Sequence, residues 1–213
     1  MKYDFIEIGT SDFDTLIQTC RYDEIGLSIE PLKCYQDKLP NKPNVKKINV
    51  GISNINGEST IFYIHEDDIK KYKLPDWVRG CNSVGKIHPS LNAEVKWVND
   101  ILIRCLKPFN INEVNKIVRE EKIKVINWDT LVKNESIEGI GFLKIDTEGH
   151  DIVILKDYLK KCESNPSLLA NKIQFESNQL IPKYEVDNII KILEDKKYSL
   201  KERGHETILI KNE

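Results

Sequence analysis

The sequence predicts an α/β protein with a mostly parallel, twisted sheet and an antiparallel strand at its C-terminal edge. Short apolar runs alternate along the chain with segments of helical periodicity, which is typical of this class. Two of these runs end in an acidic turn, one from Tyr3 to Asp12 and the other from Phe142 to His150. Because ligands bind at the carboxyl ends of parallel strands, these two turns indicate one small-molecule site.

The N-terminal half follows a β-α-β-α-β order. The expected elements are a strand over 4–8, a helix over 12–20, a strand over 26–29, a helix over 32–39 and a strand over 45–50. Connections between parallel strands are right-handed, so we expect these three strands to lie in one sheet.

The C-terminal half continues the alternation. The expected strands are 141–145, 172–175, 198–202 and 206–211, and the expected helices are 150–161 and 186–194. The last two strands are separated only by the turn 203–205, so they should pair antiparallel.

The middle of the chain interrupts this alternation of strands and helices. Asn56-Gly57 predicts a tight turn, and with it a hairpin over 52–63. Residues 65–122 are too irregular for a regular crossover and too apolar for a linker. We expect them to form an insertion in a single domain of residues 1–213, serving as a lid or acceptor pocket. Its aromatic residues could stack on a sugar ring, although packing in the core is their commoner use.

Composition narrows the functional classes. The chain has 213 residues, a formal net charge of -2 and 40% hydrophobic residues, which suits one soluble domain and gives no bias toward nucleic acid. We find neither a signal peptide nor a run of apolar residues long enough to span a membrane. The five cysteines are scattered, which predicts reduced thiols, a cytoplasmic location and no zinc site. The oligomeric state is left open.

The first acidic turn bears on the cofactor. A dinucleotide-binding turn counted from Gly9 needs glycine where this chain has Ser11 and Asp14. Acidic residues here, Asp12 included, would also repel a pyrophosphate. S-adenosylmethionine has no phosphate, and its ammonium can pair with carboxylates. The turn therefore favours S-adenosylmethionine over NAD, and an NAD-type oxidoreductase remains as a weaker alternative.

Acidic residues on other strands fit the same ligand. Glu30 ends the second strand, where a carboxylate can accept both ribose hydroxyls, although it could also be an ordinary exposed acid before Pro31. Glu7 lies inside an apolar strand and must be paired or face a ligand. Asp146 and Glu148 follow the later strand, where one of them could instead cap the next helix.

These residues together resemble the FkbM-type methyltransferases, which have the Rossmann-like class I fold. The resemblance covers roughly Tyr3 to Lys211. It rests on these motifs: Glu7-Ile8-Gly9, Glu30-Pro31, Asn56-Gly57-Glu58, Trp128-Asp129-Thr130-Leu131 and, most specifically, Leu143-Lys144-Ile145-Asp146-Thr147-Glu148-Gly149-His150 with Ile154-Leu155. The resemblance implies methyl transfer from S-adenosylmethionine, commonly to a hydroxyl of a sugar or small metabolite.

The resemblance also implies roles for single residues. The methionine part would be held by Glu7, Gly9, Thr10, Ser11 and Asp12, the ribose by Glu30 with Pro31, and the adenine by Ser53 or Asn54, while Asp146 would border the sulfonium. Asn82 and Ser83 are acceptor-side candidates. This chain has Thr10-Ser11-Asp12 where a turn rich in small residues is commoner.

Transfer to a hydroxyl also requires a general base. Asp146, Glu148, His150 and His88 are the candidates, and histidine has the most suitable ordinary pKa. A polar residue that only covers the first turn of a helix is, however, the commoner role for a histidine in such a position. The acids are spread among cofactor positions, so we expect no metal. A noncatalytic binding module of the same fold remains as an alternative.

Overall fold

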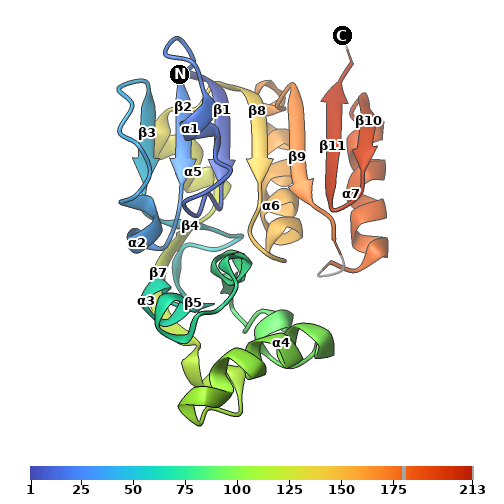
Figure 1. Ribbon diagram of the computed structural model, residues 1–213. Coiled ribbons are helices and arrows are strands. Elements are labelled where there is room, and N and C mark those ends of the chain that lie inside the picture. Colours follow the sequence, from blue (N-terminus) through green and yellow to red (C-terminus); the bar gives the residue numbers. More distant parts are fainter. Residues whose placement is uncertain (179–180, 213) are drawn as a thin grey trace. The chain divides into compact units, whose positions relative to one another are not determined.

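A computed structural model describes residues 1–178 and 181–212. The chain forms two compact units (Figure 1). The first unit contains residues 1–57 and 124–213, and the second contains residues 58–123. The second unit thus includes the whole segment expected to be an insertion. Its role as a lid or acceptor pocket stays a prediction.

The first unit is built on a seven-stranded sheet in the order β10-β11-β9-β8-β1-β2-β3. The strands are β1 (Lys2–Ile8), β2 (Gly26–Ile29), β3 (Val45–Ile48), β8 (Gly139–Ile145), β9 (Lys172–Glu176), β10 (Tyr198–Arg203) and β11 (Glu206–Lys211). Neighbours from β9 to β3 are parallel, whereas β11 is antiparallel to both β9 and β10. The predicted fold class is confirmed.

Helices lie on both faces of this sheet (Figure 1). They are α1 (Leu16–Thr19), α2 (Lys33–Gln36), α5 (Trp128–Glu135), α6 (Asp151–Ser164), the short 3-10 helix η5 (Pro166–Leu168) and α7 (Lys183–Asp195). Helices α5, α6 and α7 contribute to the main core, while α1 packs with Phe5, Leu39 and Val45 in a smaller cluster. Within the described residues, no helix combines the length and apolar character that a membrane crossing needs.

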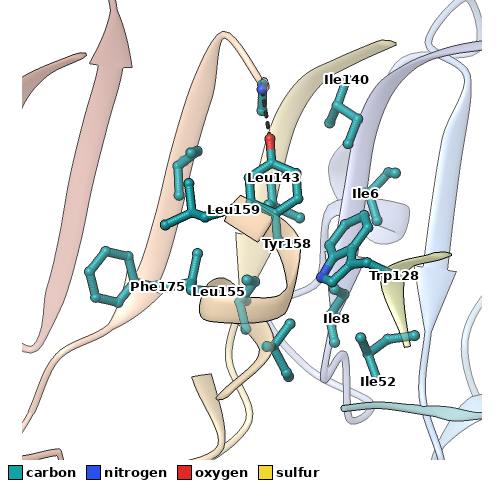
Figure 2. Close-up of a cluster of buried hydrophobic side chains, with 14 of the residues drawn as sticks. Ile6, Ile8, Ile52, Trp128, Ile140, Leu143, Leu155, Tyr158, Leu159 and Phe175 are labelled. Carbon is teal, nitrogen blue, oxygen red and sulfur yellow. Dashed lines mark hydrogen bonds between the residues drawn. The ribbon is translucent and has the colours of Figure 1, made fainter. Parts of the chain in front are cut away.

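The main core centres on two aromatic side chains (Figure 2). The rings of Trp128 and Tyr158 lie 4.8 Å apart, beside Ile6, Ile8 and other side chains of the sheet. The Tyr158 hydroxyl donates to the carbonyl of Leu168 and accepts from the N–H of Ala170, each at 2.8 Å. The hydroxyl of this buried tyrosine therefore both donates and accepts a hydrogen bond.

Two predicted helices are shorter than expected. Only 16–19 of the predicted helix 12–20 is helical, because Asp14 adopts a left-handed backbone with φ of 53° that breaks the preceding turn. The predicted helix 32–39 is reduced to α2, and residue 39 precedes Pro40, which disfavours a helical conformation there. Such short helices depend on packing against the sheet rather than on their own propensity.

The predicted hairpin is wrong. The expected strand 45–50 ends at Ile48 as β3, and β4 (Gly51–Ile52) then pairs in parallel with β7 (Arg119–Ile126) rather than with the next strand. The side chain of Asn56 accepts a hydrogen bond from the N–H of Asn127 at 3.0 Å, so this asparagine binds a distant segment. A local turn signal cannot reveal such a partner.

The second unit consists mainly of short elements. They are β5 (Gly57–Tyr63), α3 (Glu66–Tyr72), η1 (Asp76–Gly80), β6 (Ser83–Val84), η2 (Pro89–Leu91), α4 (Lys96–Leu106), η3 (Lys107–Phe109) and η4 (Val114–Ile117). It has its own core, in which Ile64, Val78, Leu91, Leu102 and Leu106 are almost completely buried. The unit is therefore held together by apolar packing despite its irregular backbone.

Candidate functional site

The carboxyl end of β1 passes directly against the end of β8. Gly9 has φ of 81°, and an added Cβ would lie 1.9 Å from the carbonyl oxygen of Asp146. A side chain at position 9 would clash with the backbone after β8, so the packing of the sheet requires glycine whether or not a ligand is bound. Beyond it, the hydroxyl oxygens of Thr10 and Ser11 are buried and have no hydrogen-bond partner among the residues described.

Glu30 joins this turn from the end of β2. It is 4% exposed, and its two carboxylate oxygens accept from the N–H of Ser11 at 2.7 Å and of Leu32 at 2.8 Å. Burial raises the pKa of Glu30 to about 7. Each carboxylate oxygen can accept a second hydrogen bond, so the group can still receive two donors from a ligand. Pro31, half-buried, follows directly, and the Asp12 carboxylate pairs with Lys38 at 3.2 Å.

Glu7 is predicted to contact a cofactor, and in the structure its carboxylate is hydrogen-bonded to other residues of the protein. It is 1% exposed, and its carboxylate accepts from the Lys144 ammonium at 3.0 Å and from the N–H of Leu16 at 2.8 Å. Burial raises its pKa, and the charge of Lys144 only partly offsets this effect. Lys144 also donates to the carbonyl of Asp14, so the pair fastens the β1 turn and α1 to β8.

Three carboxylates converge beyond β8 and β9. Asp146 and Glu148 lie in the turn after β8, Glu176 ends β9, and one carboxylate oxygen from each lies within 4.8 Å of the others. Glu148 and Gly149 have positive φ values of 52° and 99°, which bends the chain sharply at this point. The expectation that the acids are spread apart fails for these three. Such a group can share protons or bind a cation.

Proton sharing is indicated by the shifted pKa values. Burial, followed by the charges of Glu148 and Asp151, raises the pKa of Glu176 to about 10. Burial and the same neighbouring carboxylates raise the pKa of Asp146 to about 7. At neutral pH, Glu176 is therefore protonated and Asp146 is poised between its two states, which lets one carboxyl donate while another accepts.

Asp151 fixes the relative positions of these strand ends. It is completely buried at the start of α6, and one carboxylate oxygen accepts from both the hydroxyl of Thr147 at 2.7 Å and its N–H at 3.3 Å. Its other oxygen accepts from the N–H of Glu176 at 3.1 Å. One side chain thus ties the turn after β8 to the end of β9.

His150 contacts the residue expected near the adenine. Its Nε2 lies 3.1 Å from the Ser53 hydroxyl, which donates in turn to the side-chain oxygen of Asn54 at 3.3 Å. In the arrangement in which Ser53 donates to Asn54, it accepts from His150 Nε2–H, and Nδ1 is then the unprotonated nitrogen. Burial lowers the pKa of His150, which keeps the ring neutral at pH 7.

The acceptor-side candidates Asn82, Ser83 and His88 lie in the second unit. The Asn82 amide donates to the carbonyl of Arg79 at 2.8 Å, and Ser83 is 2% exposed on β6. His88 is 4% exposed, and its Nδ1 accepts from the N–H of Ser90 at 3.1 Å at the start of η2. His88 therefore has a helix-capping contact in this structure.

Sequence reasoning missed Glu176, Asp151 and Lys144 as parts of this site. Glu176 could have been found, because it ends a buried parallel strand as Glu30 does. Asp151 resembles any acidic residue in the first turn of a helix. Lys144 lies on β8 within an otherwise apolar run, and its pairing with Glu7 joins residues that are far apart in the sequence.

The fold is that of an α/β protein with a mostly parallel sheet, a class in which ligands bind at the carboxyl ends of the strands. The model of the methyltransferase FkbM domain matches residues 7–200. The chain therefore belongs to the FkbM methyltransferase family. A comparison with curated proteins gave no match.

A solved structure shows the same fold. The crystal structure of methyltransferase FkbM from Methylobacillus flagellatus KT superposes with a TM-score of 0.52 at 12% identity. The match covers 99% of this chain and 44% of the other, so the present chain spans less than half the length of that relative. At this identity the likeness concerns the fold alone.

Proposed function

We propose that this protein transfers a methyl group from S-adenosylmethionine to a hydroxyl group of a carbohydrate or small metabolite. The observation that carries the proposal is Glu30, a buried carboxylate at the end of β2 whose oxygens already bond the β1 turn. Vicinal ribose hydroxyls would use its remaining lone pairs. Membership of a methyltransferase family supports the same activity.

The first turn fits the amino acid end of this cofactor. The partnerless buried hydroxyls of Thr10 and Ser11 offer polar groups that a ligand carboxylate or ammonium can satisfy. Ser11 and Asp14 stand where a dinucleotide-binding turn needs glycine, which disfavours a pyrophosphate and therefore NAD. Glu7, in contrast, is 1% exposed and paired with the Lys144 ammonium, so we assign it to holding the turn rather than to touching the ligand.

The residues past β8 would serve the reaction itself. The cofactor supplies a methyl carbon already activated by the sulfonium, and the protein positions the acceptor in line with it. Asp146, when ionised, would favour the sulfonium charge. Burial lowers the pKa of His150, and in the tautomer whose Nε2–H donates to Ser53 the free Nδ1 would take the proton of an acceptor hydroxyl.

Calorimetric titration tests the cofactor. We expect saturable binding of S-adenosylhomocysteine, no binding of NADH, and weaker binding of the first ligand by Glu30→Ala. Asp37→Asn is the matched control, because Asp37 is an exposed acid that pairs with Lys33 just beyond α2. Binding of NADH alone would replace the proposal with an oxidoreductase.

Radiolabelled methyl transfer then tests the chemistry. With an acceptor found by screening hydroxyl compounds, His150→Gln should lower kcat while leaving binding of S-adenosylhomocysteine intact. Full activity of this variant would remove His150 from the mechanism. Binding of the cofactor with no transfer to any acceptor would instead favour a noncatalytic module.

A further inference from the structure

An ion pair joins the turn after β1 to the end of α2. The Lys38 ammonium lies 3.2 Å from the Asp12 carboxylate, and the two side chains are 34% and 9% exposed. Lys38 follows α2 and Asp12 follows β1, so both lie toward the carboxyl end of the sheet (Figure 1). Lys38 therefore brings a cation to an edge that carries several acidic side chains.

This pair is adjacent to groups that the proposed cofactor would use. The N–H of Ser11 donates to Glu30 at 2.7 Å, so the residue directly before Asp12 is bonded to the carboxylate that we assign to the ribose. Thr10 is 3% exposed, and its hydroxyl has no hydrogen-bond partner within the described part of the chain. Because these turn residues are consecutive, a ligand that bonds both Glu30 and the Thr10 hydroxyl would lie beside the ion pair.

Lys38 can bind a ligand while it stays paired with Asp12. An ammonium has three N–H donors, and the Asp12 carboxylate accepts from this one at 3.2 Å. The ammonium also lies 5.2 Å from the centre of the Tyr35 ring, a favourable contact that restricts where the side chain can point. Lys33 differs, because it is 68% exposed and pairs with Asp37 at the surface.

An ion pair is complementary to a zwitterion. The amino acid end of S-adenosylmethionine carries a carboxylate and an ammonium on one carbon, and each would meet its opposite charge at Lys38 and Asp12. We propose that Lys38 binds the cofactor carboxylate while Asp12 binds its ammonium, which makes Lys38 a specificity-determining residue. This inference rests on the proposed function, because it takes S-adenosylmethionine as the cofactor.

Calorimetry with a matched set of thioadenosines tests the assignment. S-adenosylhomocysteine has both charged groups, its decarboxylated analogue has only the ammonium, its deaminated analogue has only the carboxylate, and 5′-methylthioadenosine has neither. All four ligands keep the adenine and the ribose. A general disturbance of the site would therefore weaken all of them, whereas loss of one charge contact would weaken only the ligands that carry the matching group.

Lys38→Met should separate these ligands. It removes the cation and keeps an unbranched side chain, and we expect the affinity for S-adenosylhomocysteine to fall about tenfold. The decarboxylated analogue should bind equally well or more tightly, because Asp12 then lacks its counter-charge and attracts the ligand ammonium. The affinity for 5′-methylthioadenosine should not change. Lys33→Met is the matched control and should leave all four affinities unchanged.

Asp12→Asn should give the complementary pattern. The affinity for S-adenosylhomocysteine should fall again, because the ligand ammonium loses its charged partner. The deaminated analogue should now bind equally well or more tightly, since Lys38 lacks its counter-charge and attracts the ligand carboxylate. The two variants together thus assign each end of the ion pair to one ligand group.

The possible outcomes separate this inference from the proposed function. An equal loss for all four ligands in Lys38→Met would mean that Lys38 only supports the turn, and an unchanged affinity for S-adenosylhomocysteine would mean that it does not contact the carboxylate. Either result would overturn the inference, while binding by the unmodified protein would still support the cofactor. Failure of the unmodified protein to bind any of the four ligands would instead contradict the proposed function and this inference together.

Discussion

The buried acid Glu7 and the half-buried acids Asp146, Glu148 and Glu176 belong to the same sheet but differ in their counter-charges. Glu7, on β1, has a lysine ammonium at 3.0 Å and a backbone N–H at 2.8 Å. Asp146 and Glu176, at the ends of β8 and β9, face Glu148 and each other, and burial together with these negative charges raises the pKa of Glu176 to about 10. An acid paired in this way supports the fold, whereas a cluster of unbalanced acids is typical of a functional site.

The largest expected effect is at Glu7. Glu7→Gln leaves the Lys144 ammonium, whose side chain is 13% exposed, without its charged partner. We expect the free energy of unfolding to fall by about 3 kcal/mol, as measured by urea denaturation. The exposed pair of Lys33 with Asp37 is the comparison, and Asp37→Asn should cost less than about 1 kcal/mol. Equal effects at the two sites would show that the buried pair does not hold the turn.

Glu176→Gln should have the opposite sign. Glu176 is protonated in the folded protein up to about pH 10, while in the unfolded chain it ionises near its ordinary value of 4.5. The folded state therefore binds more protons between these values, so stability declines as the pH rises through this window. Glutamine does not titrate, so at this position it adds no dependence of stability on pH.

We expect Glu176→Gln to raise stability on the order of 2 kcal/mol at pH 8. The gain should be smaller at pH 5, and urea denaturation at the two pH values measures the difference. Glutamine keeps the side-chain oxygen that accepts from Asn178, so the hydrogen bond itself is preserved. A loss of stability at pH 8 would mean that a positive charge balances the cluster.

Ligand binding should depend on pH through Glu30. Its pKa of about 7 means that roughly a tenth of the carboxyls are ionised at pH 6, whereas most are ionised at pH 8. Ribose hydroxyls donate to the ionised form, so S-adenosylhomocysteine should bind about tenfold more weakly at pH 6. Glu30→Gln should remove this dependence in calorimetry, and Asp146→Asn should keep it. If S-adenosylhomocysteine bound the unmodified protein equally well at pH 6 and pH 8, Glu30 would not contact the ligand.

The smallest expected effect is that of a chelator. Protonation of Glu176 reduces the negative charge of the cluster without a cation, so we expect EDTA to leave S-adenosylhomocysteine binding and methyl transfer unchanged. Activity measured after dialysis against EDTA, and again with added Mg²⁺, provides the test. Restoration of activity by Mg²⁺ alone would show that the three carboxylates hold a metal.

The sequence allowed the sheet, and the residues that meet at its carboxyl edge, to be predicted because both depend on local patterns. Alternating apolar runs indicated the parallel strands, and the edge rule placed Gly9, Glu30 and Asp146 together. The same rule applied to residues 172–175 would have added Glu176.

The remaining features depend on contacts between distant residues. The hairpin at 52–63 failed because Asn56 bonds Asn127 rather than closing a local turn. The partner of Glu7 was not predicted, because Lys144 lies on a neighbouring strand far along the sequence. An acidic residue in a strand can be recognised as unusual from its sequence, but the identity of its counter-charge comes only from the sheet order.

The close approach of Gly9 to Asp146 also restricts how this protein can evolve. The backbone of β8 leaves no room for a side chain at position 9, whatever molecule is bound. Selection for a different ligand therefore has to act on the residues that follow, from Thr10 to Asp12. Conservation of glycine at position 9 would therefore reflect the packing of the sheet, whereas changes at positions 10–12 would reflect a change of ligand.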